Sequence, residues 1–179
     1  MSGLIQPIRG VMPTIARDAY VAPNSAVIGN VAIGSHATIW FNCVLRGDDG
    51  IITVGENTNL QDGTIVHLTE NEFDTHIGAN VTVGHRAILH GCTLEDWCFI
   101  AIDAVLLDGS YVETGAMVAA GALVTPGKRV PSGEIWAGRP AKFWRKVTPE
   151  ERAGWPSLVQ HYVNLGQTYL GEPAQRKRA

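Results

Sequence analysis

Aliphatic side chains recur along most of this chain at intervals of six residues. The longest uninterrupted series is Ile88, Leu94, Ile100, Leu106, Val112, Val118, Val124, Val130 and Trp136. An upstream series keeps the spacing but shifts in phase: Val21, Val27, Ile33, Ile39, Leu45 and Ile51, then Val54, Leu60 and Val66, then Ile77 and Val83. Neither a helix nor an alternating strand generates a period of six. The series predicts short strands joined by corners, coiled so that one aliphatic side chain per strand points inward.

Glycines mark the expected corners. They follow the downstream aliphatic residues by three positions: Gly91, Gly109, Gly115, Gly121, Gly127 and Gly133, with Trp97 and Asp103 in the two remaining places. Glycine adopts positive φ at little steric cost, which suits a tight corner. A β-sandwich, the main alternative, would show alternation within strands and turn signals about every 8 to 12 residues, and the series does not fit it. We therefore predict an all-β solenoid over residues 21–140, preceded by an N-terminal segment over residues 1–20.

The chain changes character after Pro140. Residues 148–151 have the features of a helix start, namely an N-cap threonine, a proline at the first helical position and a capping-box acid. The Trp155-Pro156 step is expected to break or restart this helix. Apolar residues at helical spacing then predict a stripe that packs along the coil or on a neighbouring subunit: Leu158, Tyr162, Leu165 and Tyr169. Residues 141–179 are thus predicted to be a helical segment and tail, and a candidate cover for the end of the coil.

Composition indicates a single soluble domain of 179 residues with a net charge of −3. The basic residues are scattered apart from Arg176, Lys177 and Arg178, which we expect to form a loose tail rather than a nucleic-acid patch. No stretch approaches the roughly 18 apolar residues of a membrane span, and residues 1–10 lack a secretory apolar region. A cytoplasmic protein without nucleic-acid or membrane partners is expected.

The three cysteines, Cys43, Cys92 and Cys98, predict packing rather than chemistry. Their number is odd, and the sequence contains no C-x-x-C motif. Cys92 and Cys98 are six residues apart and therefore occupy equivalent positions on successive sides of the coil. Buried free cysteine behaves as a small apolar side chain.

One polar insertion, from Leu68 to Thr75, interrupts the aliphatic series directly after His67. Imidazole is a common zinc ligand, and three histidines that leave one position open are typical of a catalytic site. His67 and His90 each follow an aliphatic residue that is expected to point inward, so both should point outward, whereas His85 lies near a corner. One protomer is therefore not expected to bring all three together, and a site shared between subunits would do so. The other histidines are expected to be ordinary surface or corner residues: His36, His76 and His161.

Four stretches resemble the gamma-class carbonic anhydrases and their bacterial homologues. They are Trp40 to Asp48 (WFNCVLRGD), Asn59 to Gly63 followed by His67, Val83 to His85, and Leu89 to Cys92. The resemblance extends from about Ile15 to Leu170. It implies a left-handed parallel β-helix with a C-terminal helix, and the left hand comes from the family alone, because crossovers are usually right-handed.

The resemblance also implies a homotrimer with zinc at each subunit interface. His67 and His90 would bind the metal from one subunit and His85 from the next. Arg46, Asp48 and Asp62 would form a charged cluster across the interface, since a guanidinium suits paired carboxylates. The implied reaction is the hydration of carbon dioxide to bicarbonate. Zinc lowers the pKa of its bound water to about 7, an effect for which carbonic anhydrase is the standard example.

Four further residues match catalytic positions of the family. Gln61 would orient the zinc-bound hydroxide, and Glu70 matches the proton-transfer glutamate. Tyr162 and Asn164 match a late Tyr-x-Asn, whose asparagine helps to place carbon dioxide. Residues two apart do not share a helix face, so these two are not expected to face the metal together. The acidic loop is shorter than in the archaeal prototype, so Glu72 or external buffer could replace Glu70.

Two other functions fit the same coil. Hexapeptide acyltransferases and thioesterases share the six-residue period and an exit like Gly138 to Lys142, but they usually rely on a catalytic histidine without metal. A metal-bearing scaffold with little activity is the other alternative. Metal content measured together with carbon dioxide hydration, against acyl-CoA turnover, distinguishes them. The sequence also leaves open zinc, Fe²⁺ or Co²⁺, because a three-histidine site accepts several divalent ions.

Overall fold

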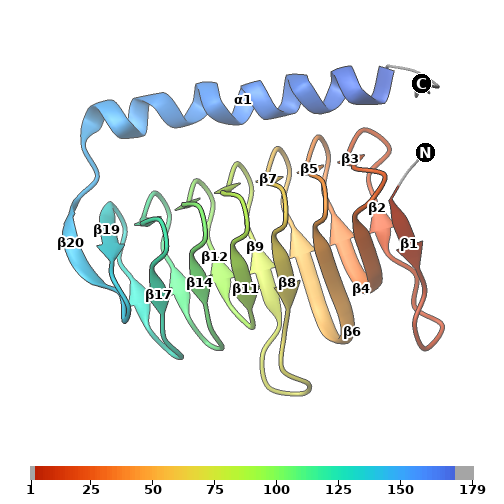
Figure 1. Cartoon of the computed structure of the whole chain (residues 1–179), viewed down its shortest axis with the longest axis horizontal. Coiled ribbons are helices and arrows are strands. Elements are labelled where there is room, and N and C mark those ends of the chain that lie inside the picture. Colours follow the sequence, from red (N-terminus) through yellow and green to blue (C-terminus); the bar gives the residue numbers. More distant parts are fainter. Residues whose placement is uncertain (1–2, 172–179) are drawn as a thin grey trace, which may run out of the picture.

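The computed structural model describes residues 3–171 and confirms the predicted solenoid (Figure 1). Short parallel strands wind into a left-handed β-helix of about seven turns. The coil has three flat faces, each a stack of strands from successive turns, and one helix runs beside it.

We number the faces in chain order. Face 1 stacks β1 (Leu4–Gln6), the first halves of β4 (Ala26–Ile33) and β6 (Val44–Val54), β8 (Ile65–His67), β11 (Ile88–His90), β14 (Val105–Leu106) and β17 (Leu123–Val124). Face 2 stacks β2 (Thr14–Ile15), the second halves of β4 and β6, β9 (Thr75–Ile77), β12 (Thr93–Leu94), β15 (Tyr111–Val112) and β18 (Arg129–Val130). Face 3 stacks β3 (Tyr20–Val21), β5 (Thr38–Ile39), β7 (Asn59–Leu60), β10 (Thr82–Val83), β13 (Phe99–Ile100), β16 (Met117–Val118), β19 (Glu134–Ala137) and the antiparallel β20 (Lys142–Lys146). Two of these strands, β1 and β2, lie within the first 20 residues and pair with β4.

The aliphatic series fills the core, with two corrections. Ile51 and Ile88 are 41% and 39% exposed, and their neighbours Ile52 and Leu89 point inward instead. Trp136 stacks on Val118 and packs against the core as predicted, whereas Ile135 aligns with Met117 on the outer side of face 3. Strand register decides this, because Leu89 stacks between Val66 and Leu106. Corners differ in length by a residue, so the inward position moves while the stack stays aligned. Each buried aliphatic side chain stabilises the coil by roughly 1.5 to 3 kcal/mol.

The glycine corners are confirmed. All six predicted glycines have positive φ, between 56° and 69°. Trp97 and Asp103, which replace glycine in the series, adopt the same conformation with φ of 61° and 63°. The left-handed conformation costs a non-glycine residue about 1 to 2 kcal/mol, so the coil imposes it even where the residue disfavours it.

Helix α1 (Pro149–Gly171) is continuous, so the expected break at Trp155-Pro156 is wrong. Its most buried residues are Trp155, Val159, Val163 and Gly166. The predicted stripe lies beside them and packs along the coil as expected, with Tyr162 and Leu165 half-buried against Tyr20 and Trp40. Trp155 packs on Phe99 of face 3, with ring centroids 5.6 Å apart. This packing holds the helix together although proline removes one intrahelical hydrogen bond.

The helix lies along the coil and not across its end, so the predicted end cover is also wrong (Figure 1). It runs back over face 3, where it contacts β3, β5 and β7. Outward-pointing polar residues of that face are buried beneath it, among them Thr38, Asn59 and Thr82. The basic tail predicted at residues 176–178 lies outside the described residues.

The predicted packing role of the cysteines is confirmed. Cys43, Cys92 and Cys98 are free and buried, and burial raises the pKa of the Cys43 and Cys92 thiols to about 12. Within residues 3–171, no helix combines the length and the apolar character needed to cross a bilayer.

Candidate metal centre

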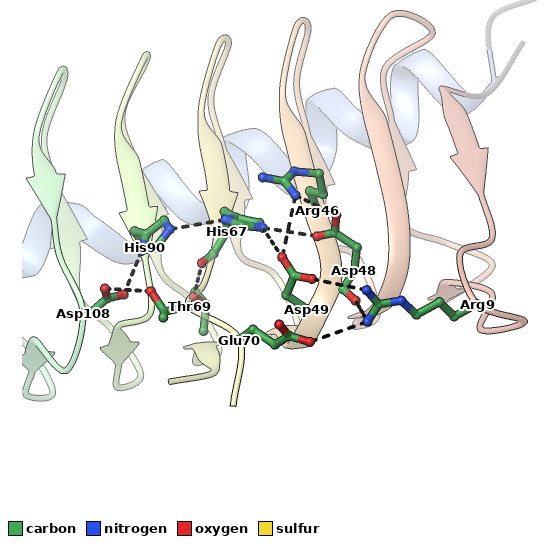
Figure 2. Close-up of polar contacts among 10 residues, drawn as sticks. Arg9, Arg46, Asp48, Asp49, His67, Thr69, Glu70, His90 and Asp108 are labelled. Atoms are coloured by element: carbon green, nitrogen blue, oxygen red, sulfur yellow. Dashed lines mark hydrogen bonds and ion pairs between the residues drawn. The ribbon is translucent and has the colours of Figure 1, made fainter. Parts of the chain in front are cut away.

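His67 and His90 form a pair on neighbouring strands of face 1. They are the last residues of β8 and β11 and are directly aligned in the sheet. Each follows an inward aliphatic residue, so both rings point outward, as predicted (Figure 2). His67 Nδ1 lies 3.2 Å from His90 Nε2, and the side chains are 16% and 30% exposed.

The outer nitrogen of each ring faces carboxylates. His90 Nδ1 lies 2.7 Å from Asp108 Oδ1. His67 Nε2 lies 3.2 Å from Asp48 Oδ1 and 3.7 Å from Asp49 Oδ2. Ionised carboxylates only accept hydrogen bonds, so these contacts place the imidazole hydrogens on the outer nitrogens.

This arrangement fits a divalent metal ion. With hydrogens on the outer nitrogens, His67 Nδ1 and His90 Nε2 present lone pairs to one another across 3.2 Å, which is unfavourable unless a cation or proton joins them. Two nitrogens bound to tetrahedral zinc at about 2.0 to 2.1 Å would be about 3.3 Å apart. Carboxylates behind ligating histidines are the usual second layer of such sites.

Two arginines neutralise the carboxylates beside His67. Arg46 Nη1 donates to Asp48 Oδ2 at 2.6 Å, and Arg9 lies 3.9 Å from Asp49. Burial raises the pKa of the Asp48 carboxyl, but hydrogen bonds from Arg46 and His67 outweigh burial and lower it overall. Among residues 3–171, the one group of three close metal-ligand types is Asp48, Asp49 and His67. Because the arginines already pair with these oxygens, we interpret this group as an ion-pair network.

The polar insertion after His67 forms a loop that projects on the side of the coil opposite α1 (Figure 1). Glu70 is exposed in this loop and lies 3.8 Å from Arg9 (Figure 2). Glu72 lines an open cleft of about 320 Å³ beside it, together with Asp49, Gly50, Asn71, Phe73 and Asp74. Asp49 therefore lies between the cleft and His67.

His85 and Asp62 lie elsewhere in the chain, in the corners that precede β11 and β8. The two are paired, with His85 Nδ1 2.9 Å from Asp62 Oδ2. These corners lie at one edge of face 1, and the strand ends that carry His67 and His90 lie at the opposite edge. Strand residues advance by about 3.3 Å each, so the length of the strands separates the two edges. Within one chain, the structure joins Arg46 to Asp48 but Asp62 to His85, and it does not bring His85 to the other two histidines.

Gln61 shares the edge of His85 and Asp62. It is 7% exposed, and its Nε2 donates to Asn59 Oδ1 at 3.2 Å. Asn59 is buried and donates in turn to Thr82. The Gln61 side chain is therefore fixed, with its Oε1 left as the available acceptor.

Tyr162 and Asn164 point in different directions, as expected for residues two apart on a helix. Tyr162 is half-buried against Trp40, with ring centroids 5.6 Å apart. Burial raises the pKa of Tyr162, and the Asp62 carboxylate raises it further. Asn164 is exposed and accepts a hydrogen bond from Gln160 at 2.9 Å.

Sequence reasoning missed several residues of this region: Arg9, Asp49, Asn59, Thr69 and Asp108. Asp108 could have been found, because it lies 18 residues after His90 and one full turn contains three six-residue repeats. Asp49 directly follows Asp48. No sequence pattern points to Arg9, because it belongs to an N-terminal hairpin closed by Ile8 and Val11 and reaches the site only in the folded chain.

Comparisons with known proteins agree with this fold. Residues 12–47 match the family model "Bacterial transferase hexapeptide (six repeats)". The chain is 37% identical over 173 residues to a carbonic anhydrase of Geobacillus kaustophilus, covering 97% of this chain and 94% of the relative. It is 50% identical over 165 residues to the mitochondrial gamma carbonic anhydrase 2 of Arabidopsis thaliana, covering 89% of this chain and 59% of that protein.

A solved structure also shares the fold of this chain. The crystal structure of a hexapeptide transferase family protein from Anaplasma phagocytophilum has 46% identity and a TM-score of 0.89, covering 93% of this chain and 98% of that one. The chain spans only 59 to 65% of the length of the plant relatives.

Proposed function

The chain belongs to the gamma carbonic anhydrase family, and on that basis we propose that it hydrates carbon dioxide reversibly to bicarbonate at a zinc centre shared between subunits. The observation that carries the proposal is the pair His67 and His90, whose inner nitrogens face one another at 3.2 Å while carboxylates occupy the outer ones. A structural metal would need a closed ligand set, whereas a third histidine from a second copy leaves one position open for water.

The third ligand is His85 of a neighbouring copy. His85 lies at the opposite edge of face 1, so a cyclic assembly can bring this edge of one copy against His67 and His90 of the next. A row of apolar side chains between the two edges supports such a contact: Val44, Ile65, Ile88, Val105 and Leu123. The family implies three copies.

A zinc ion held there would lower the pKa of a bound water to about 7, which supplies a nucleophile at neutral pH. Gln61 lies on the His85 edge, and its Oε1 is the free acceptor that can orient the attacking oxygen. Asn59 keeps the Gln61 amide in place. In the assembly, Asp62 would approach Arg46 and Asp48 of the next copy.

Each hydration releases one proton, which must leave the site. Glu70 and Glu72 lie on the loop that follows His67 and are exposed to solvent. Arg9 holds Glu70 on the side of Asp49, and Asp49 contacts His67. These carboxylates form a short route from the site to buffer. Asn164 and Tyr162 belong to the other edge and would contribute from the neighbouring copy.

The decisive experiment uses complementation between inactive variants. We expect about one metal ion per protomer in the unmodified protein and almost none in His67→Ala or His85→Ala. Mixing these two variants under subunit exchange should restore metal at about a quarter of the interfaces, because a quarter combine the intact edges. The matched control is a mixture of His67→Ala with His90→Ala, which should restore nothing, since both defects lie on one edge.

Elemental analysis and stopped-flow carbon dioxide hydration on the same samples provide the readouts. Recovery in the control mixture, or no recovery in the first despite demonstrated exchange, would refute the shared site. The Anaplasma protein is named as a transferase relative, so acyl-CoA turnover is measured in parallel. Metal-replete protein that hydrolyses thioesters through these histidines but does not hydrate carbon dioxide would favour the acyltransferase alternative. Protein that shows neither activity would favour a metal-bearing scaffold. If elemental analysis finds iron or cobalt, that metal replaces zinc in the proposal.

A further inference from the structure

The loop that interrupts the coil is tied to His90 through one carboxylate. Asp108 Oδ1 contacts His90 Nδ1 at 2.7 Å, and Asp108 Oδ2 accepts a hydrogen bond from the Thr69 hydroxyl at 2.9 Å. Asp108 follows β14, whereas Thr69 lies in the loop between β8 and β9 (Figure 2). One side chain therefore connects the loop, the next turn of the coil and the histidine.

Two glycine corners make room for this connection. A methyl group added at Gly91 would lie 2.1 Å from Asp108 Oδ1 and 2.9 Å from Phe73 Cβ. One added at Gly109 would lie 3.0 Å from the Phe73 ring. The loop thus packs through Phe73 on two corners that lack side chains, and the Asp108 carboxylate lies against the first of them.

Further contacts fix the loop at both ends. Thr69 and Phe73 pair in an antiparallel bridge, so the residue that contacts Asp108 is held by the residue that packs on the glycines. At the other end, the Thr75 hydroxyl donates to the His67 carbonyl at 2.6 Å and accepts from Gly91 N at 3.0 Å. The loop is consequently a fixed support rather than a free insertion.

The consequence concerns the tautomer of His90. A carboxylate fixed at Nδ1 favours the tautomer with hydrogen on Nδ1 and a lone pair on Nε2, the nitrogen that faces His67. We propose that Asp108 is the positioning residue that holds His90 in this tautomer, and that the loop sets Asp108 through Thr69 and Phe73. The proposal builds on the proposed metal centre, but the tautomer is measurable without any metal.

The test combines nitrogen-15 NMR of the metal-free protein with zinc affinity measured by competition with a chelator. At a pH where the imidazoles are neutral, we expect His90 to be protonated on Nδ1. Asp108→Ala should shift it toward the Nε2-protonated form and weaken zinc binding by about 10- to 100-fold. Thr69→Val should change both in the same direction by less. Asp103→Asn, which removes an exposed carboxylate paired with Arg86, is the control and should change neither.

A glycine pair gives a second test that does not remove the carboxylate. Gly91 and Gly133 both have positive φ, 56° and 68°, so alanine strains both corners. Only at Gly91 would the new methyl group meet Asp108, because nothing lies within 4 Å of the corresponding position at Gly133. Gly91→Ala should alter the tautomer and zinc affinity, and Gly133→Ala should only lower the melting temperature.

The proposal is overturned if His90 carries its hydrogen on Nε2 in the unmodified protein, or if Asp108→Ala changes neither readout. Equal effects of the two glycine variants would also overturn it. If the unmodified protein binds no zinc, the metal centre fails, and the tautomer alone still decides the role of Asp108.

Discussion

At the scale of single residues, neighbours decide what each histidine does. His67 and His90 have carboxylates on their outer nitrogens and face one another through the inner ones. His36 occupies a corner beside Asp18, His76 contacts Thr53, and His161 is exposed, as predicted for residues outside the site. His67 and His90 thus form a candidate metal pair because the coil supplies each of them with a partner on both sides.

Gln61 gives the prediction at this scale. Gln61→Ala should keep the metal content and lose hydration rate, on the order of 100-fold, because the residue orients a reacting oxygen and binds no metal. Elemental analysis and stopped-flow hydration measure the two quantities. Gln6→Ala, at an exposed position of β1, is the control. Loss of metal from the Gln61 variant would instead indicate a structural role for the buried amide.

At the scale of elements, the junction of β20 and α1 fixes the helix over face 3. Arg145 donates two hydrogen bonds to Glu151, at 2.8 and 2.6 Å. Glu151 also accepts from the backbone of Thr148, whose hydroxyl accepts from Glu151 N, which confirms the predicted capping box. Hydrogen bonds from Arg145, and then from Thr148, lower the pKa of Glu151 from 4.5 to about 2.

The lowered pKa predicts how stability depends on pH. A carboxylate whose folded pKa is depressed stabilises the protein above its unfolded pKa, and this contribution is lost as pH falls through the folded value. Glu151→Gln should therefore lower the free energy of unfolding at neutral pH, measured by urea denaturation, by about 1 kcal/mol. The difference from the unmodified protein should shrink as pH falls from 4.5 toward 2. Glu150→Gln, in the same helical turn, is the control. An identical pH profile for both variants would attribute the effect to the helix dipole rather than to Arg145.

At the scale of the whole molecule, the faces differ in what covers them. Helix α1 buries the outer side of face 3. Face 1 has no such cover among residues 3–171, although its outward row is apolar and leaves Ile65 and Ile88 38% and 39% exposed. The proposed assembly would bury this row between the two edges that carry the site residues, so oligomerisation and metal binding are expected to depend on each other.

Ile65→Lys tests this dependence. A lysine ammonium within an apolar contact is costly to desolvate, so the variant should dissociate and lose metal together. Light scattering at micromolar concentration and elemental analysis provide the measurements. Met12→Lys, at an exposed apolar position before β2, should leave both unchanged. A monomeric unmodified protein, or a dissociated variant that keeps its metal, would contradict the proposed interface.

The sequence by itself determined the repeating coil, its corners, the capping box and the outward direction of His67 and His90. These follow from local rules, because a six-residue period, glycine in left-handed corners and a cap each act within a few residues. Only the tertiary structure decided which of Ile51 or Ile52, and Ile88 or Leu89, points inward, since stacking on neighbouring turns sets the register. It also decided that α1 stays continuous through Pro156 along face 3, and that Arg9, Asp49, Thr69 and Asp108 surround the paired histidines. Those contacts join residues far apart in the sequence, such as Arg9 with Asp49 and Thr69 with Asp108, and their energies depend on packing between turns that no local pattern records.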